Sequence, residues 1–179
     1  MKKILVLILS IAVMFSFTSC DFFGTKRNPN STSEKVKFST VDRYGTKYTE
    51  DVCKDYDLTI INLWEPWCKP CVSELPALNN LYRNYKDKGV LILGVYSETD
   101  MEREVYDLIS YYNISYPLLH SSSDFKKYST GHIPTTIFVD KDGYIINVDK
   151  SQGKDGTRLI GARSYADWEK LVKDNLISD

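Results

Sequence analysis

The sequence lacks an excess of charge of either sign. Its 179 residues carry 23 Lys and Arg side chains against 24 Asp and Glu, which gives a formal net charge of −1. A nucleic-acid partner is not expected, because binding to a polyanion requires a concentrated basic surface. The sequence also has no internal repeat and no long run of charge. Its length and its 42% content of hydrophobic residues predict one soluble domain with a substantial core.

The sequence also lacks an apolar run of transmembrane length. A spanning helix needs about 20 apolar residues, whereas the run "ILVLILSIAVMFSF" (4–17) has fourteen. It lies between "MKK" and "TSC", which is the layout of a secretory signal. The ending "FTSC" resembles the lipobox of bacterial lipoproteins, although Phe17 replaces the usual Leu. The resemblance implies that residues 1–19 are a signal peptide and that Cys20 is lipidated; a plain signal or a retained anchor is the alternative.

The segment that follows the signal has little apolar periodicity. Residues 20–35 are rich in Asn, Ser, Thr and Lys, a composition typical of flexible linkers. We therefore expect a lipid anchor and tether over 20–35 and a folded domain over 36–179.

Hydrophobic patterning predicts an α/β domain. We expect a hairpin near 36–49, strands at 58–64, 90–96, 135–140 and 144–149, and helices near 71–88, 101–112, 123–129 and from Ser164 onward. Strand–helix–strand units favour parallel pairing, and Asp142-Gly143 favours a late antiparallel hairpin. The expected fold is a mixed central sheet with helices on both faces and an N-terminal hairpin extension.

Cysteine and histidine are scarce, with four and two residues. Cys68 and Cys71 form a Cys-x-x-Cys pair where a predicted strand turns into a helix. A zinc site needs four ligands, and the domain offers only Cys53, His120 and His132 besides this pair. A purely structural disulfide usually closes a longer loop.

A redox-active dithiol is therefore the favoured interpretation of the pair. A helix N-terminus stabilises thiolate, which is the nucleophile. We expect Cys68 at an exposed tip with Lys69 beside it, and Cys71 facing inward. Cys53 is expected to be an ordinary buried or half-buried residue, and His120 and His132 are expected to be ordinary loop residues, so no metal and no cofactor is predicted.

The segment "IINLWEPWCKPCVSELP" resembles the active-site segment of the thioredoxin superfamily. It is similar in particular to the TlpA/ResA group of membrane-anchored thiol–disulfide reductases, and "GHIPTTIFVD" resembles the superfamily's cis-proline segment. The resemblance covers residues 36 to 177 and implies a thioredoxin-like fold. It also implies that Pro134 follows a cis bond, that Ile133 contacts substrate, and that Trp67 shields Cys68.

Two positions depart from the pattern of that family. Glu65 replaces the Ala or Gly of many members, and its charge could oppose the effect of Lys69 on Cys68. Asn62 replaces the buried Asp that thioredoxin carries six residues before its first cysteine. Glu74 lies one helical turn after Cys71 on the same face, so we expect it to be the catalytic base, with a raised pKa.

The resemblance implies a membrane-tethered extracytoplasmic thiol–disulfide oxidoreductase of bacteria, acting as a monomer. The expected clients are exported protein disulfides, such as those of apocytochrome c or a methionine sulfoxide reductase. The expected electron donor is a membrane thiol transporter of the DsbD/CcdA type. A disulfide-forming oxidant is the alternative. A peroxidase would need Thr where Glu65 stands, and a copper metallochaperone would need a different cysteine spacing.

Overall fold

A computed structural model describes residues 27–149 and 156–176 of the chain. The signal peptide predicted over 1–19 and the lipidation predicted at Cys20 lie outside the described residues. Within the described part, no helix is both long and apolar enough to cross a bilayer.

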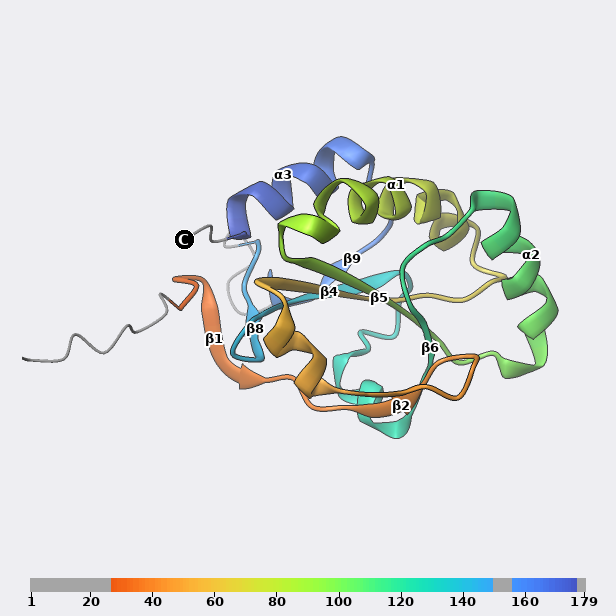
Figure 1. Ribbon diagram of the computed structural model, residues 1–179, viewed down its shortest axis with the longest axis horizontal. Coiled ribbons are helices and arrows are strands. Elements are labelled where there is room, and N and C mark those ends of the chain that lie inside the picture. The colour runs from red at the N-terminus through yellow and green to blue at the C-terminus, as the bar shows by residue number, and fades with distance from the viewer. Residues whose placement is uncertain (1–26, 150–155, 177–179) are drawn as a thin grey trace, which may run out of the picture.

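A seven-stranded mixed sheet forms the centre of the domain (Figure 1). Its strand order is β1-β8-β7-β4-β5-β6, and the short strand β9 pairs with the first two residues of β7. The strands are β1 (Ser31–Lys35), β4 (Leu58–Leu63), β5 (Val90–Tyr96), β6 (Leu118–His120), β7 (Thr135–Asp140), β8 (Tyr144–Ile146) and β9 (Leu159–Ile160).

Strand β4 lies at the centre because it is apolar on both faces. All six of its residues are buried, as are those of its neighbours β5 and β7. Strand β5 pairs with β4 in parallel, from Leu58 opposite Val90 to Leu63 opposite Val95, and β7 pairs on the other side antiparallel. Continuous apolar runs are typical of strands covered on both faces.

Three α-helices of the described residues pack on one face of this sheet (Figure 1). They are α1 (Lys69–Tyr85), α2 (Glu102–Tyr112) and α3 (Tyr165–Asn175), and they bury Leu75, Val105 and Trp168 in one shared core cluster. Two short 3-10 helices, η2 (Lys86–Lys88) and η3 (Thr99–Met101), lead out of α1 and into α2.

The opposite face is covered by shorter elements. The 3-10 helices η1 (Glu50–Asp55) and η4 (Ser123–Tyr128) lie there with the two-stranded hairpin of β2 (Ser39–Val41) and β3 (Lys47–Thr49). Phe38, Cys53 and Phe125 belong to the core cluster of this face. The predicted thioredoxin-like arrangement, with helical segments on both faces and an N-terminal hairpin, is confirmed.

Three segments differ from what the sequence predicted. Residues 31–35 were expected to be part of a tether, but β1 pairs antiparallel with β8, so the domain boundary at 35/36 is wrong. This strand is polar and lies at the sheet edge, where backbone hydrogen bonds rather than an apolar pattern hold it. The short strand β9 and the helix η1 were also missed. His120 is not a loop residue, since it ends β6 and lies 2.8 Å from a carboxylate oxygen of Glu102.

Candidate active site: the Cys68–Cys71 disulfide

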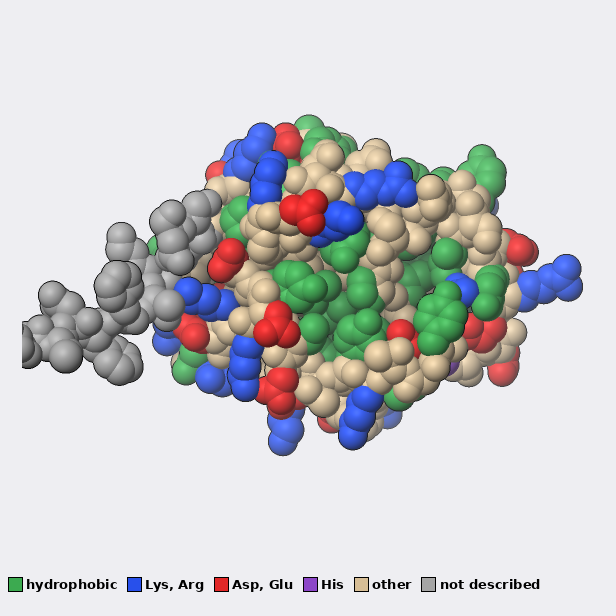
Figure 2. All heavy atoms as spheres, in the orientation of Figure 1, with side chains coloured by type: hydrophobic (Ala, Val, Ile, Leu, Met, Phe, Trp, Pro, Cys, Tyr) green, Lys and Arg blue, Asp and Glu red, His purple; other side chains and the backbone are tan. Residues whose placement is uncertain are grey.

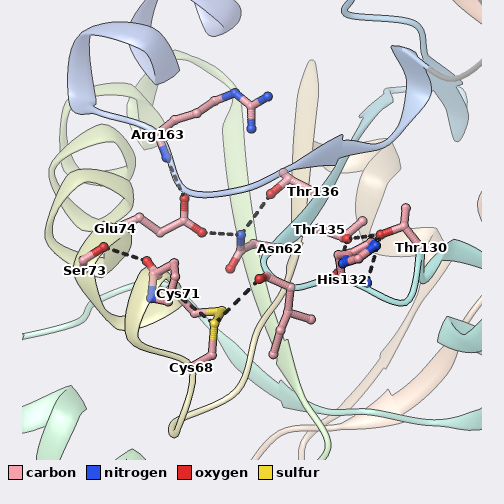
Figure 3. The surroundings of a disulfide bond; sticks show 12 residues. Asn62, Cys68, Cys71, Ser73, Glu74, Thr130, His132, Thr135, Thr136 and Arg163 are labelled. Carbon is pink, nitrogen blue, oxygen red and sulfur yellow. Dashed lines mark hydrogen bonds between the residues drawn. A yellow bond between two sulfur atoms is a disulfide. The ribbon is translucent and has the colours of Figure 1, made fainter. Parts of the chain in front are cut away.

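The cysteine pair lies at the start of α1, directly after the central strand β4 (Figure 3). Cys68 is the N-cap of the helix, and its Sγ atom accepts a hydrogen bond from the backbone N–H of Cys71 at 3.3 Å. Pro70 occupies the first turn, where no intrahelical partner for an N–H exists. Cys68 and Cys71 are joined by a disulfide. This short segment therefore places two sulfur atoms at the positive end of a long helix.

The two cysteines differ less in exposure than the sequence predicted. Cys71 is fully buried and Cys68 is only 5% exposed, so the prediction of an exposed tip at Cys68 is wrong. The exposed residue at the tip is Trp67, at 58%. Cys68 is covered by the segment before β7, because its Sγ atom lies 3.8 Å from the carbonyl oxygen of Ile133.

That covering segment contains the cis-proline that the resemblance implied. The peptide bond between Ile133 and Pro134 is cis. The Thr135 hydroxyl donates to the carbonyl oxygen of His132 at 2.6 Å and lies 2.8 Å from the Thr130 hydroxyl. The side chain of His132 is exposed, and the residue enters these contacts through its backbone. The main chain of Ile133 is therefore held against the dithiol.

Glu74 lies on the buried face of α1, one turn after Cys71 (Figure 3). The residue is 2% exposed. Its Oε1 atom accepts a hydrogen bond from the Asn62 side-chain amide at 3.0 Å, and Oε2 accepts one from the backbone N–H of Arg163 at 3.2 Å. The same amide nitrogen of Asn62 donates to the Thr136 hydroxyl at 2.9 Å. Asn62 therefore orients the carboxyl group of Glu74 and does not itself act as the base.

Burial raises the pKa of the Glu74 carboxyl from 4.5 to about 7. The hydrogen bonds from Asn62 and from the backbone of Arg163 favour the charged form and oppose this rise, but desolvation is the larger effect. The raised pKa expected for Glu74 is confirmed. A carboxyl group with this pKa can both take up and release a proton near neutral pH.

Glu65 has a role that the sequence did not reveal. Its Oε1 atom accepts hydrogen bonds from the Ser97 backbone N–H at 2.9 Å and from the Ser97 hydroxyl, and Oε2 accepts one from the Glu98 N–H at 3.1 Å. Its carbonyl oxygen accepts from the N–H of Cys68 at 3.1 Å. The residue is 7% exposed. Glu65 thus ties the loop before Cys68 to the chain that leaves β5.

The remaining cysteine of the described part lies away from this site. Cys53 is free and fully buried in the core cluster of the other sheet face, and burial raises the pKa of its thiol to about 11. At neutral pH it is therefore a protonated, inert thiol. In residues 27–149 and 156–176, no three His, Cys, Asp or Glu side chains come together as a metal site.

Comparison with known sequences assigns this chain to a family. The model of the AhpC/TSA family matches residues 32–148. The thiol-disulfide oxidoreductase ResA of Bacillus thuringiensis (strain Al Hakam) is 34% identical over 175 residues, which cover 96% of this chain and 93% of that protein. ResA of Geobacillus kaustophilus is 29% identical over 149 residues, covering 81% and 83%.

Solved structures share the fold at lower sequence identity. A thioredoxin family thiol:disulfide interchange protein of Chlorobium tepidum has a TM-score of 0.65 and 23% identity, covering 82% of this chain and all of that one. StoA of Bacillus subtilis has a TM-score of 0.59 and 21% identity, covering 79% and 99%.

Proposed function

Since the chain belongs to the ResA group of thiol–disulfide oxidoreductases, within the AhpC/TSA family, we propose that it reduces disulfides of exported proteins through Cys68 and Cys71. The observation that carries this proposal is the disulfide between these two residues at the N-terminus of α1. It is the oxidised form that such an enzyme reaches after one round of substrate reduction. The enzyme is thus a thiol–disulfide oxidoreductase, and the direction of net transfer is part of the proposal.

The first step is attack by the Cys68 thiolate. The helix N-terminus and the N–H of Cys71 both favour a negative charge on its sulfur, and the exposed Lys69 follows it in the chain. The thiolate attacks one sulfur of the substrate disulfide and forms a mixed disulfide. The other substrate sulfur leaves as a thiolate and takes a proton. The backbone of Ile133, which lies against Cys68, is positioned to pair with the substrate chain as an added strand.

The second step is resolution by Cys71. Its buried thiol must lose a proton before it can attack, and burial disfavours the thiolate. Glu74 takes that proton, directly or through water, because its pKa near 7 suits proton exchange at neutral pH. The Cys71 thiolate then attacks the Cys68 sulfur and releases the second substrate thiol. Two electrons have passed from the enzyme dithiol to the substrate disulfide.

The proposed location rests on the predicted signal segment, and the proposed partners rest on the resemblance to the ResA group. A signal over 1–19 and a lipid on Cys20 would hold the domain at the extracytoplasmic face of the membrane. A membrane thiol transporter of the DsbD/CcdA type would return the enzyme to its dithiol form. Apocytochrome c and an exported methionine sulfoxide reductase are the proposed classes of client.

Trapping of the mixed disulfide tests the proposal. Cys71→Ser retains the attacking thiolate but cannot resolve, so covalent adducts with exported proteins should accumulate in cells and appear on non-reducing gels. Cys68→Ser is the matched control and should form no such adducts and reduce no insulin. Adducts that form through Cys71 in the Cys68→Ser variant would contradict the assigned roles. Equilibration with glutathione would give the direction, since a strongly oxidising dithiol would favour disulfide formation.

A further inference from the structure

Large apolar side chains are exposed next to the dithiol. Trp67 is 58% exposed and Tyr111 of α2 is 81% exposed. Figure 2 shows hydrophobic side chains at the surface in the centre and on the right, where α2 lies in Figure 1, among charged and other polar side chains. Exposed apolar surface that is grouped and rimmed by polar residues marks an interaction site.

These side chains line two adjoining hollows, one between α1 and α2 and one between α2 and the loop before Cys68. One hollow of about 320 Å³ is lined by Pro66, Trp67, Val72, Leu108 and Tyr112, together with Lys69 and Ser73. A second hollow of about 430 Å³ is lined by Pro66, Leu108, Tyr111, Glu104 and Asp107. The two hollows share Pro66 and Leu108 and therefore adjoin, and Trp67 and Lys69, which line the first, flank Cys68 in the sequence. Together they form a shallow groove. We call it the Trp67 groove.

The outer end of the Trp67 groove carries unpaired negative charge. Glu104 and Asp107 are exposed and lie three residues apart on α2, hence on the same face of that helix. Neither forms an ion pair with any residue of the described part of the chain. A cationic side chain in this position would be attracted by two carboxylates, and the exposed rings of Trp67 and Tyr111 would add cation–π attraction.

The walls of the groove are fixed relative to the attacking sulfur. The carboxylate of Glu65 joins the loop before Cys68 to Ser97 and Glu98, which lead into η3 and α2. These hydrogen bonds hold the loop that forms one wall of the groove, which reduces the entropic cost of binding.

We propose that the Trp67 groove binds an extended segment of the oxidised protein substrate that carries an apolar or aromatic residue next to Lys or Arg, close to the disulfide. This inference rests on the proposed function and adds a sequence preference to it. The groove fits such a segment because its apolar lining lies beside two carboxylates that form no ion pair within the described part of the chain.

Peptides that each contain one internal disulfide test this preference. One series carries the dipeptide Leu-Lys, and two matched series carry Leu-Glu or Ser-Lys in its place. In each series the dipeptide stands either directly before the first cysteine or directly after the second. The reduced full-length protein should reduce the Leu-Lys peptide with a kcat/KM about fivefold higher than the Leu-Glu peptide, in at least one placement.

Charge reversal on the enzyme provides the decisive comparison. The double variant Glu104→Lys and Asp107→Lys should invert the ratio of kcat/KM between Leu-Lys and Leu-Glu peptides. Asp55→Lys and Asp87→Lys together make the same change in net charge and should keep the wild-type ratio. Both control residues are exposed; Asp55 ends η1, before β4, and Asp87 lies in η2, before β5. Since β4 and β5 are parallel, both residues lie at the end of these strands opposite the dithiol. Tyr111→Ser should reduce the preference for Leu-Lys over Ser-Lys.

The outcomes separate this inference from the function on which it rests. If the protein reduces none of the peptides, the proposed reductase function fails. If it reduces all of them with equal kcat/KM, or if the control variant inverts the ratio as well, the groove proposal is overturned and the reductase function remains. The groove proposal is also overturned if the Glu104→Lys and Asp107→Lys substitutions change only the rate at which a donor dithiol re-reduces the enzyme. The groove would then bind the donor rather than the substrate.

Discussion

Two buried glutamates stand on either side of the dithiol, and they differ in what surrounds their carboxyl groups. Glu65 lies three residues before Cys68, and Glu74 three residues after Cys71. The carboxylate of Glu65 accepts three hydrogen bonds, all from Ser97 and Glu98. That of Glu74 accepts two, in a more deeply buried position. One carboxylate therefore serves as an anchor, and the other has a pKa near 7.

The comparison teaches that two buried glutamates beside one dithiol can differ in use: Glu65 ties two segments together, and Glu74 has a raised pKa. Backbone N–H donors aimed at a carboxylate replace lost water, and they also fix the chain that supplies them. Desolvation that exceeds the available hydrogen bonds leaves a group that exchanges protons at neutral pH. The predictions below change each glutamate in turn.

The largest expected effect is on resolution of the mixed disulfide. Glu74→Gln keeps the shape of the side chain but cannot take a proton, so release of the substrate should slow by about 100-fold. The dependence of this step on pH around 7 should disappear. Stopped-flow kinetics with a small disulfide substrate separate resolution from the first attack, which should change little. Glu65→Gln makes the same chemical change and should retain the pH dependence; its loss in both variants would contradict the comparison.

The second effect is on stability as a function of pH. The pKa of Glu74 is about 7 in the folded protein, against 4.5 for an ordinary solvated glutamate such as that of an unfolded chain, so the folded state binds the proton more tightly. The stabilisation that comes from this tighter proton binding at Glu74 is complete below pH 4.5 and is lost as the pH rises to 7. The loss amounts to about 3 kcal/mol in the free energy of unfolding.

Denaturant titrations at pH 5 and pH 8 measure that loss. The fall in the free energy of unfolding between the two pH values should be smaller in Glu74→Gln than in the wild type. An equal fall in both proteins would mean that Glu74 does not titrate in this range.

The third effect concerns the anchor. Glu65→Ala leaves the N–H groups of Ser97 and Glu98 without their acceptor, and it should lower the free energy of unfolding by about 2 kcal/mol. Hydrogen exchange at those two amides should accelerate, which localises the change to the chain leaving β5. Unchanged exchange there would show that the anchor does not hold this segment.

The smallest effect is expected for one bond of the anchor. Ser97→Ala removes only the hydroxyl that donates to Glu65, so the free energy of unfolding should fall by about 1 kcal/mol. The combined Glu65→Ala and Ser97→Ala variant should lose less than the sum of the two, because both changes remove the same contact. If the two losses of stability add strictly, the Ser97 hydroxyl contributes through a contact other than the one with Glu65.

The parts of the site that the sequence predicted depend on local spacing. Cys68 and Cys71 lie at a strand-to-helix junction, and helical periodicity alone puts Glu74 on the inward face with Cys71. The long apolar strands β4 and β5 were predicted for the same reason, since each is a continuous buried run.

The parts that the sequence did not predict depend on distant segments. The anchor of Glu65 needs Ser97, which the parallel pairing of β4 and β5 brings alongside. The burial of Cys68 needs Ile133. Strands β1 and β9 are short and at edges, and β1 is polar, so no apolar pattern identifies them.

The pKa of Glu74 in the folded protein is the most direct test of this account. Carbon-13 NMR of the side-chain carboxyl groups, assigned by comparison with Glu74→Gln, follows its titration in the oxidised protein. The account predicts a midpoint near pH 7. A midpoint near 4.5, the ordinary value of a solvated glutamate, would contradict the assignment of Glu74 as the group that takes the proton of Cys71.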